Sequence, residues 1–382
     1  MQHTMKQLAG ATLVAALSLA GTAYAQQADE VKIGFAGPMT GAQAHYGADF
    51  KNGITLGIED MNATKPVIGG KPVKFVLDAA DDQADPRTGT TVAQKLVDDG
   101  IKGMLGHFNS GTTIPASRIY ANAGIPEIAM ATAPEYTAQG FKTTFRMMTS
   151  DTQQGSVAGT FAVKSLNMKK IAIVDDRTAY GQGLADQFEK AAKAAGATIV
   201  DREFTNDKAV DFKAILTKLK AANPDLIYYG GADSQAGPMV KQMKTLGMKA
   251  PLMGGEMVHT PTFLQVAGDA ADGTIASLAG LPLDDMPGGK DYVAKYKKRF
   301  GEDVQTYSPY AYDGAMAMFN AMKKANSTDP AKYLPLLAQT DMPAVTTTHL
   351  AYDTKGDLRN GGITVYKVEG GKWTPLQSIG GK

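Results

Sequence analysis

Strand-like and helix-like segments alternate along most of this chain, and this alternation constrains the fold more than any other feature. Short apolar runs rich in β-branched residues, such as 31–36 and 170–174, are each followed by a segment with helical spacing. Repeated units of this kind are typical of parallel sheets covered by helices on both faces. The series starts at 31 and starts again at 170. We therefore predict an α/β protein with two lobes, each a mostly parallel sheet flanked by helices.

The segments after about Gly280 are expected to complete both lobes. The predicted bounds are 28–148 plus 279–352 for lobe 1, and 149–278 plus 353–382 for lobe 2. The expected strands are 31–36, 73–77, 101–106, 126–130, 143–147, 170–174, 198–204, 225–229 and 251–253, with 344–352 extended and a hairpin over 363–368 and 373–377. The expected helices are 47–61, one starting at Asp85-Pro86, 113–122, 181–195, 211–222, 234–246, 292–300 and 309–324.

Residues 1–25 have the pattern of a secretory signal peptide. Lys6 supplies the positive charge, 8–20 is an apolar stretch too short to span a bilayer, and Ala23-Tyr24-Ala25 is a small-x-small cleavage site. The alternative, a core helix, fits the terminal position and the cleavage site poorly. We predict export to the periplasm with cleavage after Ala25.

Composition excludes several classes of function. The 39 basic and 38 acidic residues leave no charge bias toward nucleic acid. The chain has no Cys, which removes thiol catalysis, Cys-based metal sites and a lipid-modified Cys anchor. Its five His form no His-Glu-x-x-His pair, and no Gly-x-Ser-x-Gly elbow is present. Four acidic residues at 78–85 lack EF-hand spacing and favour a solvated loop. We expect no enzyme activity, no metal and no cofactor.

Ligands of parallel sheets bind beyond the carboxyl ends of the strands, so two facing lobes make a cleft there. Ser110 follows a strand and precedes a helix, in a run with Thr112 and Thr113. Hydroxyls and free N–H groups at a helix start suit a ligand carboxylate, although Ser110 as a simple helix cap is the alternative. Thr132 also follows a strand, where an ordinary turn before Pro134 is the alternative.

Acidic and aromatic residues follow other strands. Glu256, after Met253-Gly254-Gly255, is either the partner of a ligand ammonium or a solvated loop charge. Asp233 is either a second cation partner or a helix N-cap. Tyr46, Tyr180 and Tyr307 can form cavity walls with polar tips, although any one of the fifteen Tyr is more often structural.

Several stretches together resemble the leucine/isoleucine/valine-binding proteins of branched-chain amino-acid ABC importers. They cover most of the chain from about 31 to 361, and they read GPMTGAQAHYG, DDQADP, GHFNSGTTIPAS, ATAPE, RTAYGQGLA, LIYYGG, LMGGE, VAGDAADG and YDTKGDL. The resemblance implies a Venus-flytrap fold with three crossovers between lobes. It implies that Ser110 and Thr132 bind the ligand α-carboxylate and α-amino groups, with backbone contacts from Met130, and that Glu256 pairs with the ammonium. Tyr180 would reach across on closure, and Tyr46, Asn109 and Tyr307 would shape the side-chain pocket.

Two departures from the family pattern affect the expected ligand. Well-known members carry a disulfide whose two positions are Ala84 and Asn109 in this chain. The aromatic residue that follows YYGG in those members is Ala232 here, and Asp233 comes next. Both changes weaken the case for leucine, isoleucine or valine and favour a larger or more polar amino acid, or one with a distal cation.

The predicted function is that of a periplasmic substrate-binding protein, which captures a small amino acid and hands it to an inner-membrane permease. A monomer suits such a shuttle. Three alternatives remain: the same fold binding another small solute such as an amide, urea or an aromatic acid; a ligand sensor that reports to a partner protein; and a hydrolase, for which no assembled nucleophile and base are visible.

Overall fold

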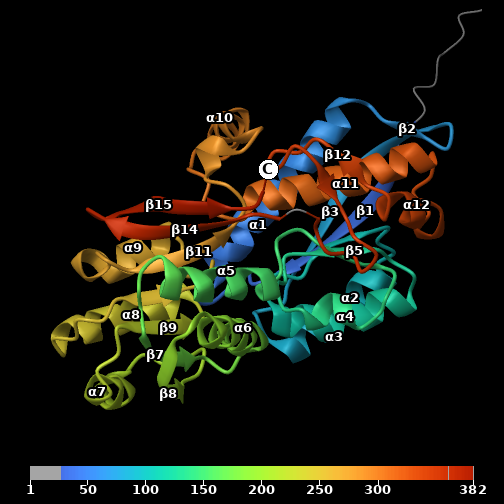
Figure 1. The fold of residues 1–382 in the computed structure, drawn as a ribbon. Coiled ribbons are helices and arrows are strands. Elements are labelled where there is room, and N and C mark those ends of the chain that lie inside the picture. Colours follow the sequence, from blue (N-terminus) through green and yellow to red (C-terminus); the bar gives the residue numbers. More distant parts are fainter. Residues whose placement is uncertain (1–26, 360, 382) are drawn as a thin grey trace, which may run out of the picture.

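The computed structural model describes residues 27–359 and 361–381 and arranges them in two α/β lobes (Figure 1). The signal peptide predicted for residues 1–25 lies outside the described residues. Each lobe has its own sheet, and in each the strands of the central region run parallel. The predicted fold class is therefore confirmed.

The sheet of lobe 1 has six strands in the order β2-β3-β1-β4-β5-β6, parallel except for the pair β2 and β3. The strands are β1 (Asp29–Gly37), β2 (Val67–Ile68), β3 (Lys71–Asp81), β4 (Met104–Gly106), β5 (Glu127–Ala129) and β6 (Thr144–Arg146). One face is covered by α1 (Ala44–Ala63) and α11 (Ser308–Ala325), and the other by α2 (Pro86–Asp98) and α3 (Ser110–Asn122) (Figure 1). Because both faces are covered, β1 is buried over nearly its whole length.

The sheet of lobe 2 has seven strands in the order β15-β14-β11-β10-β9-β7-β8. The strands are β7 (Lys170–Asp175), β8 (Thr198–Phe204), β9 (Leu226–Gly230), β10 (Leu252–Gly254), β11 (Ile275–Ala279), β14 (Ile363–Glu369) and β15 (Lys372–Ile379). The last two form the predicted terminal hairpin, in which β14 pairs with β11 in the antiparallel direction. Helices α5 (Asp151–Lys164) and α6 (Ala179–Ala195) cover one face; α7 (Lys213–Ala221), α8 (Asp233–Thr245) and α9 (Pro261–Ala267) cover the other.

The remaining elements are short or peripheral. They are α4 (Glu135–Ala138), η1 (Gly268–Ala270), η2 (Leu283–Asp285), α10 (Gly289–Phe300), α12 (Pro330–Leu337), β12 (Asp341–Met342) and β13 (Leu350–Ala351). The lobe bounds given above stay a prediction. The chain nevertheless leaves the lobe 1 sheet after β6 and enters the lobe 2 sheet at β7, and it returns to pack α11 on α1 before β14.

Some expectations from the sequence were wrong, and α9, α12 and β11 were missed as well. Helix α5 was not expected, although it packs along α6. Residues 344–352 were expected to be extended, but only Leu350–Ala351 forms a strand there. The Asp313 carboxylate accepts hydrogen bonds from the backbone N–H groups of Val345 (2.8 Å) and Thr346 (2.9 Å), so a side chain takes the donors that a strand partner would use.

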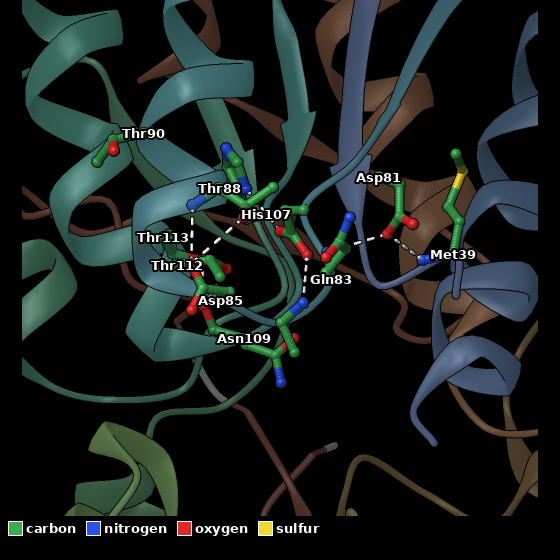
Figure 2. A network of polar contacts seen from close by, with 12 residues as sticks. Met39, Asp81, Gln83, Asp85, Thr88, Thr90, His107, Asn109, Thr112 and Thr113 are labelled. Carbon is green, nitrogen blue, oxygen red and sulfur yellow. Dashed lines mark hydrogen bonds and ion pairs between the residues drawn. The ribbon is translucent and has the colours of Figure 1, made fainter. Parts of the chain in front are cut away.

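The acidic loop after β3 is more ordered than the sequence indicated. Asp85 caps α2, as predicted, and accepts from the N–H groups of Arg87 and Thr88 (Figure 2). Asp82 is not solvated, because it is fully buried and its Oδ2 lies 2.8 Å from His107 Nδ1. His107 Nε2 in turn lies 3.0 Å from the hydroxyl of Tyr120. This buried hydrogen bond joins the loops that carry Ala84 and Asn109, the two positions at which well-known members of the family carry a disulfide.

Candidate functional site

A small cavity lies between the lobes, at the carboxyl ends of the strands. Its volume is about 230 Å³, and its lining is Phe108, Asn109, Ser110, Met130, Thr132, Tyr180, Glu256, Met257 and Tyr307. All of the predicted ligand contacts except Tyr46 and Asp233 belong to this lining. A larger hollow of about 960 Å³ opens elsewhere, beside Phe145 and Tyr352. The polar groups described below nevertheless converge on the smaller cavity, which has the apolar walls and few polar groups of a ligand site.

Ser110 supplies the hydroxyl at the lobe 1 side of the cavity. It is the first residue of α3, with Asn109 at the N-cap position, so Ser110 does not cap the helix. Its Oγ accepts a hydrogen bond from the N–H of Ala133 at 3.3 Å. The hydroxyls of Thr112 and Thr113 both donate to the Asn109 carbonyl (2.9 and 2.8 Å) and are not free for a ligand (Figure 2). The helix start and the Ser110 hydroxyl can therefore receive an anionic group.

Glu256 lies at the opposite side of the cavity and is buried, not solvated. Three neutral groups donate hydrogen bonds to its carboxylate: the Tyr180 hydroxyl at 3.0 Å, the Thr132 hydroxyl at 3.5 Å and the Gln154 amide. Burial raises the pKa of Glu256, and these hydrogen bonds partly oppose that rise. The carboxylate is thus held in place by neutral donors that bring no positive charge.

Asp151, at the start of α5, is a second acid close to Glu256. It is fully buried, and neither carboxylate oxygen has a hydrogen-bond partner among the described residues. Burial and the neighbouring charge of Glu256 both raise the pKa of Asp151. Two buried carboxyl groups at one place strongly favour a cation, since a positive charge would stabilise the ionised form of both.

Tyr46 and Asp233 lie outside the cavity lining, in a contact between the lobes. The Tyr46 hydroxyl, on α1, donates to the Met257 carbonyl at 2.6 Å. Asp233 is the first residue of α8 and not its N-cap, which is Ala232. Its Oδ2 lies 2.9 Å from His45 Nε2 and accepts from the Thr260 hydroxyl at 2.6 Å. Asp233 as a ligand contact stays a prediction, and its carboxylate already has two partners within the protein.

Replacing Tyr46 with Phe is expected to lower ligand affinity about threefold to tenfold. The change removes a buried hydrogen bond between the lobes, and a bond of this kind contributes about 0.5–1.5 kcal/mol to whichever state contains it. Isothermal titration calorimetry measures the change. Tyr333→Phe is the matched control, because the Tyr333 hydroxyl donates to the Lys102 carbonyl within lobe 1. Equal losses in the two variants would contradict a role for Tyr46 in closure.

Three residues that support the site were missed in the sequence. Gln154 and Asp151 belong to the unexpected helix α5. Ser150 followed three positions later by Gln153 is a capping-box pattern, and this signal could have located the helix. Arg146 is buried and binds the carbonyls of Ala131 and Ala133, on both sides of Thr132, and the Asp357 carboxylate at 2.8 Å. Nothing in the sequence near Arg146 indicated this role.

The model of the periplasmic binding protein family matches residues 30–372 of this chain. The chain belongs to this family. Among its relatives, the Leu/Ile/Val-binding protein homolog 1 of Brucella melitensis is 36% identical over 363 residues, 95% of each chain. The leucine-, isoleucine-, valine-, threonine- and alanine-binding protein of Pseudomonas aeruginosa is 35% identical over 357 residues, 93% of this chain and 94% of that protein.

Solved structures agree with this membership. A branched-chain amino acid transporter substrate-binding protein of Streptococcus pneumoniae, solved in complex with isoleucine, is 25% identical and superposes with a TM-score of 0.83, covering 92% of this chain and all (100%) of that chain. The resemblance to leucine/isoleucine/valine-binding proteins is therefore confirmed. These relatives are substrate-binding proteins and not enzymes. In the described part of this chain, no helix is both long and apolar enough to cross a membrane.

Proposed function

We propose that this periplasmic binding protein captures a small α-amino acid, branched-chain or related, between its lobes and delivers it to an ABC importer. One observation carries the proposal: the Ser110 hydroxyl at a helix start and the buried carboxylate of Glu256 line the same cavity, with the buried carboxyl group of Asp151 next to Glu256. A zwitterion supplies the anion for the first and the cation for the second. The names of the relatives support the same class of ligand.

In the proposed mechanism, the ligand first docks on lobe 1. Ser110 receives the α-carboxylate, Thr132 contacts the α-amino group, and Met130 adds a backbone contact. Tyr180 and Glu256 of lobe 2 then close over the ligand, and Glu256 pairs with the ammonium. The ligand binds the closed state better than the open one, and this difference in affinity drives closure. The closed form would present both lobes to the permease.

The cellular setting follows from the same proposal. The predicted signal peptide and the family support a mature protein that works in the periplasm, and in this proposal it shuttles as a monomer to a permease in the inner membrane. A sensing role would need the same ligand site and a different partner. An aromatic acid or urea is disfavoured as the ligand, because neither supplies a cation for Glu256 and Asp151.

Calorimetry on protein that has been unfolded and refolded, to strip carried-over ligand, tests the proposal. The titrants are the common α-amino acids, urea, acetamide and benzoate. We expect at least one small α-amino acid to bind, and its deaminated acid and decarboxylated amine to bind at least tenfold more weakly. The proposal fails if no amino acid binds, or if the deaminated acid binds as tightly as the amino acid.

A further inference from the structure

Two polar groups of the cavity lining have no partner and no role in the proposed capture of the α-groups. They are the amide oxygen of Asn109 and the hydroxyl of Tyr307, and neither has a partner among the described residues. We propose, on the basis of the proposed function, that the captured amino acid carries a short hydrogen-bonding side chain, a hydroxyl or an amide, and that Asn109 and Tyr307 select it.

Asn109 presents an unused hydrogen-bonding atom at the cavity. Its Nδ2 donates to Gln43 Oε1 at 2.7 Å, which fixes the amide, while its Oδ1 is buried and unpartnered. Exchanging the oxygen and the nitrogen of the amide would leave the nitrogen free instead, so one polar atom lacks a partner in either orientation. Figure 2 shows Asn109 at the edge of the loop network, beside the start of α3. An apolar ligand would leave this atom unpaired in a dry site, which is unfavourable.

Tyr307 is held firmly, so its hydroxyl cannot turn away to find another partner. Its backbone N–H donates to Asp49 Oδ2 at 2.6 Å, and the same carboxylate binds the N–H groups of Thr306 and Ser308, both at 3.0 Å. Its ring packs edge-on against Phe108, with ring centres 4.8 Å apart. Tyr307 lines the cavity, and its buried hydroxyl has no acceptor among the described residues.

Lack of a partner alone would not identify these residues, because the buried hydroxyl of Tyr352 is also unpartnered. What distinguishes Asn109 and Tyr307 is that both line the ligand cavity and that Phe108 contacts Tyr307 from the position next to Asn109. A ligand hydroxyl can donate to Asn109 and accept from Tyr307 at once, and an amide can do the same. An aliphatic side chain can do neither. The empty space of about 230 Å³ is small, so a short side chain fits it better than a long one.

Threonine and valine test the inference on the unmodified protein, because they have the same shape and differ in one hydroxyl. Calorimetry on refolded full-length mature protein is expected to give a Kd for threonine at least tenfold below that for valine. Serine, asparagine, alanine and leucine extend the series. If valine binds as tightly as threonine, the inference is overturned while the proposed function stands. If no amino acid binds, the proposed function fails first.

Two variants test whether Asn109 and Tyr307 select the ligand side chain. Asn109→Ala and Tyr307→Phe are each expected to lower the threonine-to-valine preference at least threefold, because each removes a hydrogen-bonding group that only threonine can use. Tyr352→Phe is the matched control, because it removes a buried unpartnered hydroxyl away from the cavity, and its preference should equal that of the unmodified protein. If both lining variants weaken threonine, valine and alanine equally, the two residues contact the α-groups and the inference is overturned.

Discussion

Replacing Glu256 with Gln is expected to weaken amino-acid binding about tenfold to a hundredfold. The substitution keeps the shape of the side chain and one acceptor oxygen, which can still receive the Tyr180 and Gln154 donors, but it removes the negative charge that faces the ligand ammonium. Charge-assisted hydrogen bonds contribute roughly 1.5–3 kcal/mol, which corresponds to that range of affinity. Calorimetry with the tightest-binding amino acid measures the loss. Asp151 keeps a carboxyl group nearby, so some affinity should remain.

The matched control is Glu203→Gln, which removes a carboxylate of the same lobe that pairs with Lys218 on the outer surface. Its affinity should equal that of the unmodified protein. Unchanged affinity in Glu256→Gln would contradict the assigned role of Glu256 in ammonium binding. A double variant with Asp151→Asn measures how far the two acids share the cation, because the second change should then add a further loss.

The sequence was sufficient to predict the strands that carry the site and the residues at their carboxyl ends. Strand β8 has the predicted bounds, and β7 differs from its prediction by one residue, because β8 begins with three β-branched residues and β7 is a mostly apolar run. Ser110, Thr132 and Glu256 come from different strand ends, yet they converge on one cavity because parallel strands bring their carboxyl ends to a common edge. This convergence follows from topology and needs no knowledge of side-chain packing.

Helix α5 escaped prediction because it packs through small residues. A Cβ atom added at Gly155 would lie 2.5 Å from Gln187 Cβ, and one at Gly159 would lie 2.6 Å from the Phe188 carbonyl oxygen, so α6 approaches at glycine positions. Glycine and alanine in the contact face leave little hydrophobic periodicity to detect. Asp151 and Gln154 were lost with this helix.

The other wrong predictions concern side chains whose hydrogen-bond partners are distant in the sequence. Asp233 at a helix start reads equally well as an N-cap, and only the fold shows that His45, 188 residues away, is its partner. Asp82 likewise reads as one of several solvated acids until His107 is placed beside it. A local pattern identifies a residue suited to a cap or a loop, whereas the choice of partner depends on how the lobes and loops pack.

The second large effect that we expect is a loss of stability in acid, caused by the buried side chain of His259. The residue follows Glu256 in the same loop, its ring lies 4.1 Å from Tyr366 and 4.7 Å from Trp373 between ring centres, and both ring nitrogens are buried without a partner among the described residues. Burial lowers the pKa of His259 from 6.5 to about 3. Below pH 6.5 the unfolded chain therefore binds a proton that the folded protein does not, and the free energy of unfolding falls as the pH falls, until about pH 3. The loss through His259 is about 2 kcal/mol at pH 5.

His259→Phe keeps the aromatic contacts and cannot bind a proton, so its free energy of unfolding should fall by about 2 kcal/mol less than that of the unmodified protein between pH 8 and pH 5. The free energy of unfolding must be compared between the variant and the unmodified protein at each pH, because other groups also titrate in this range. Burial raises the pKa of Asp176 and Asp313 to about 6, so protonation of these acids stabilises the fold as the pH falls. Urea unfolding at each pH gives the difference. His349→Leu is the control, since that side chain is 74% exposed and its loss should leave the pH dependence unchanged. An NMR titration of His259 with a midpoint near pH 6.5 would contradict the burial of its ring nitrogens as the cause.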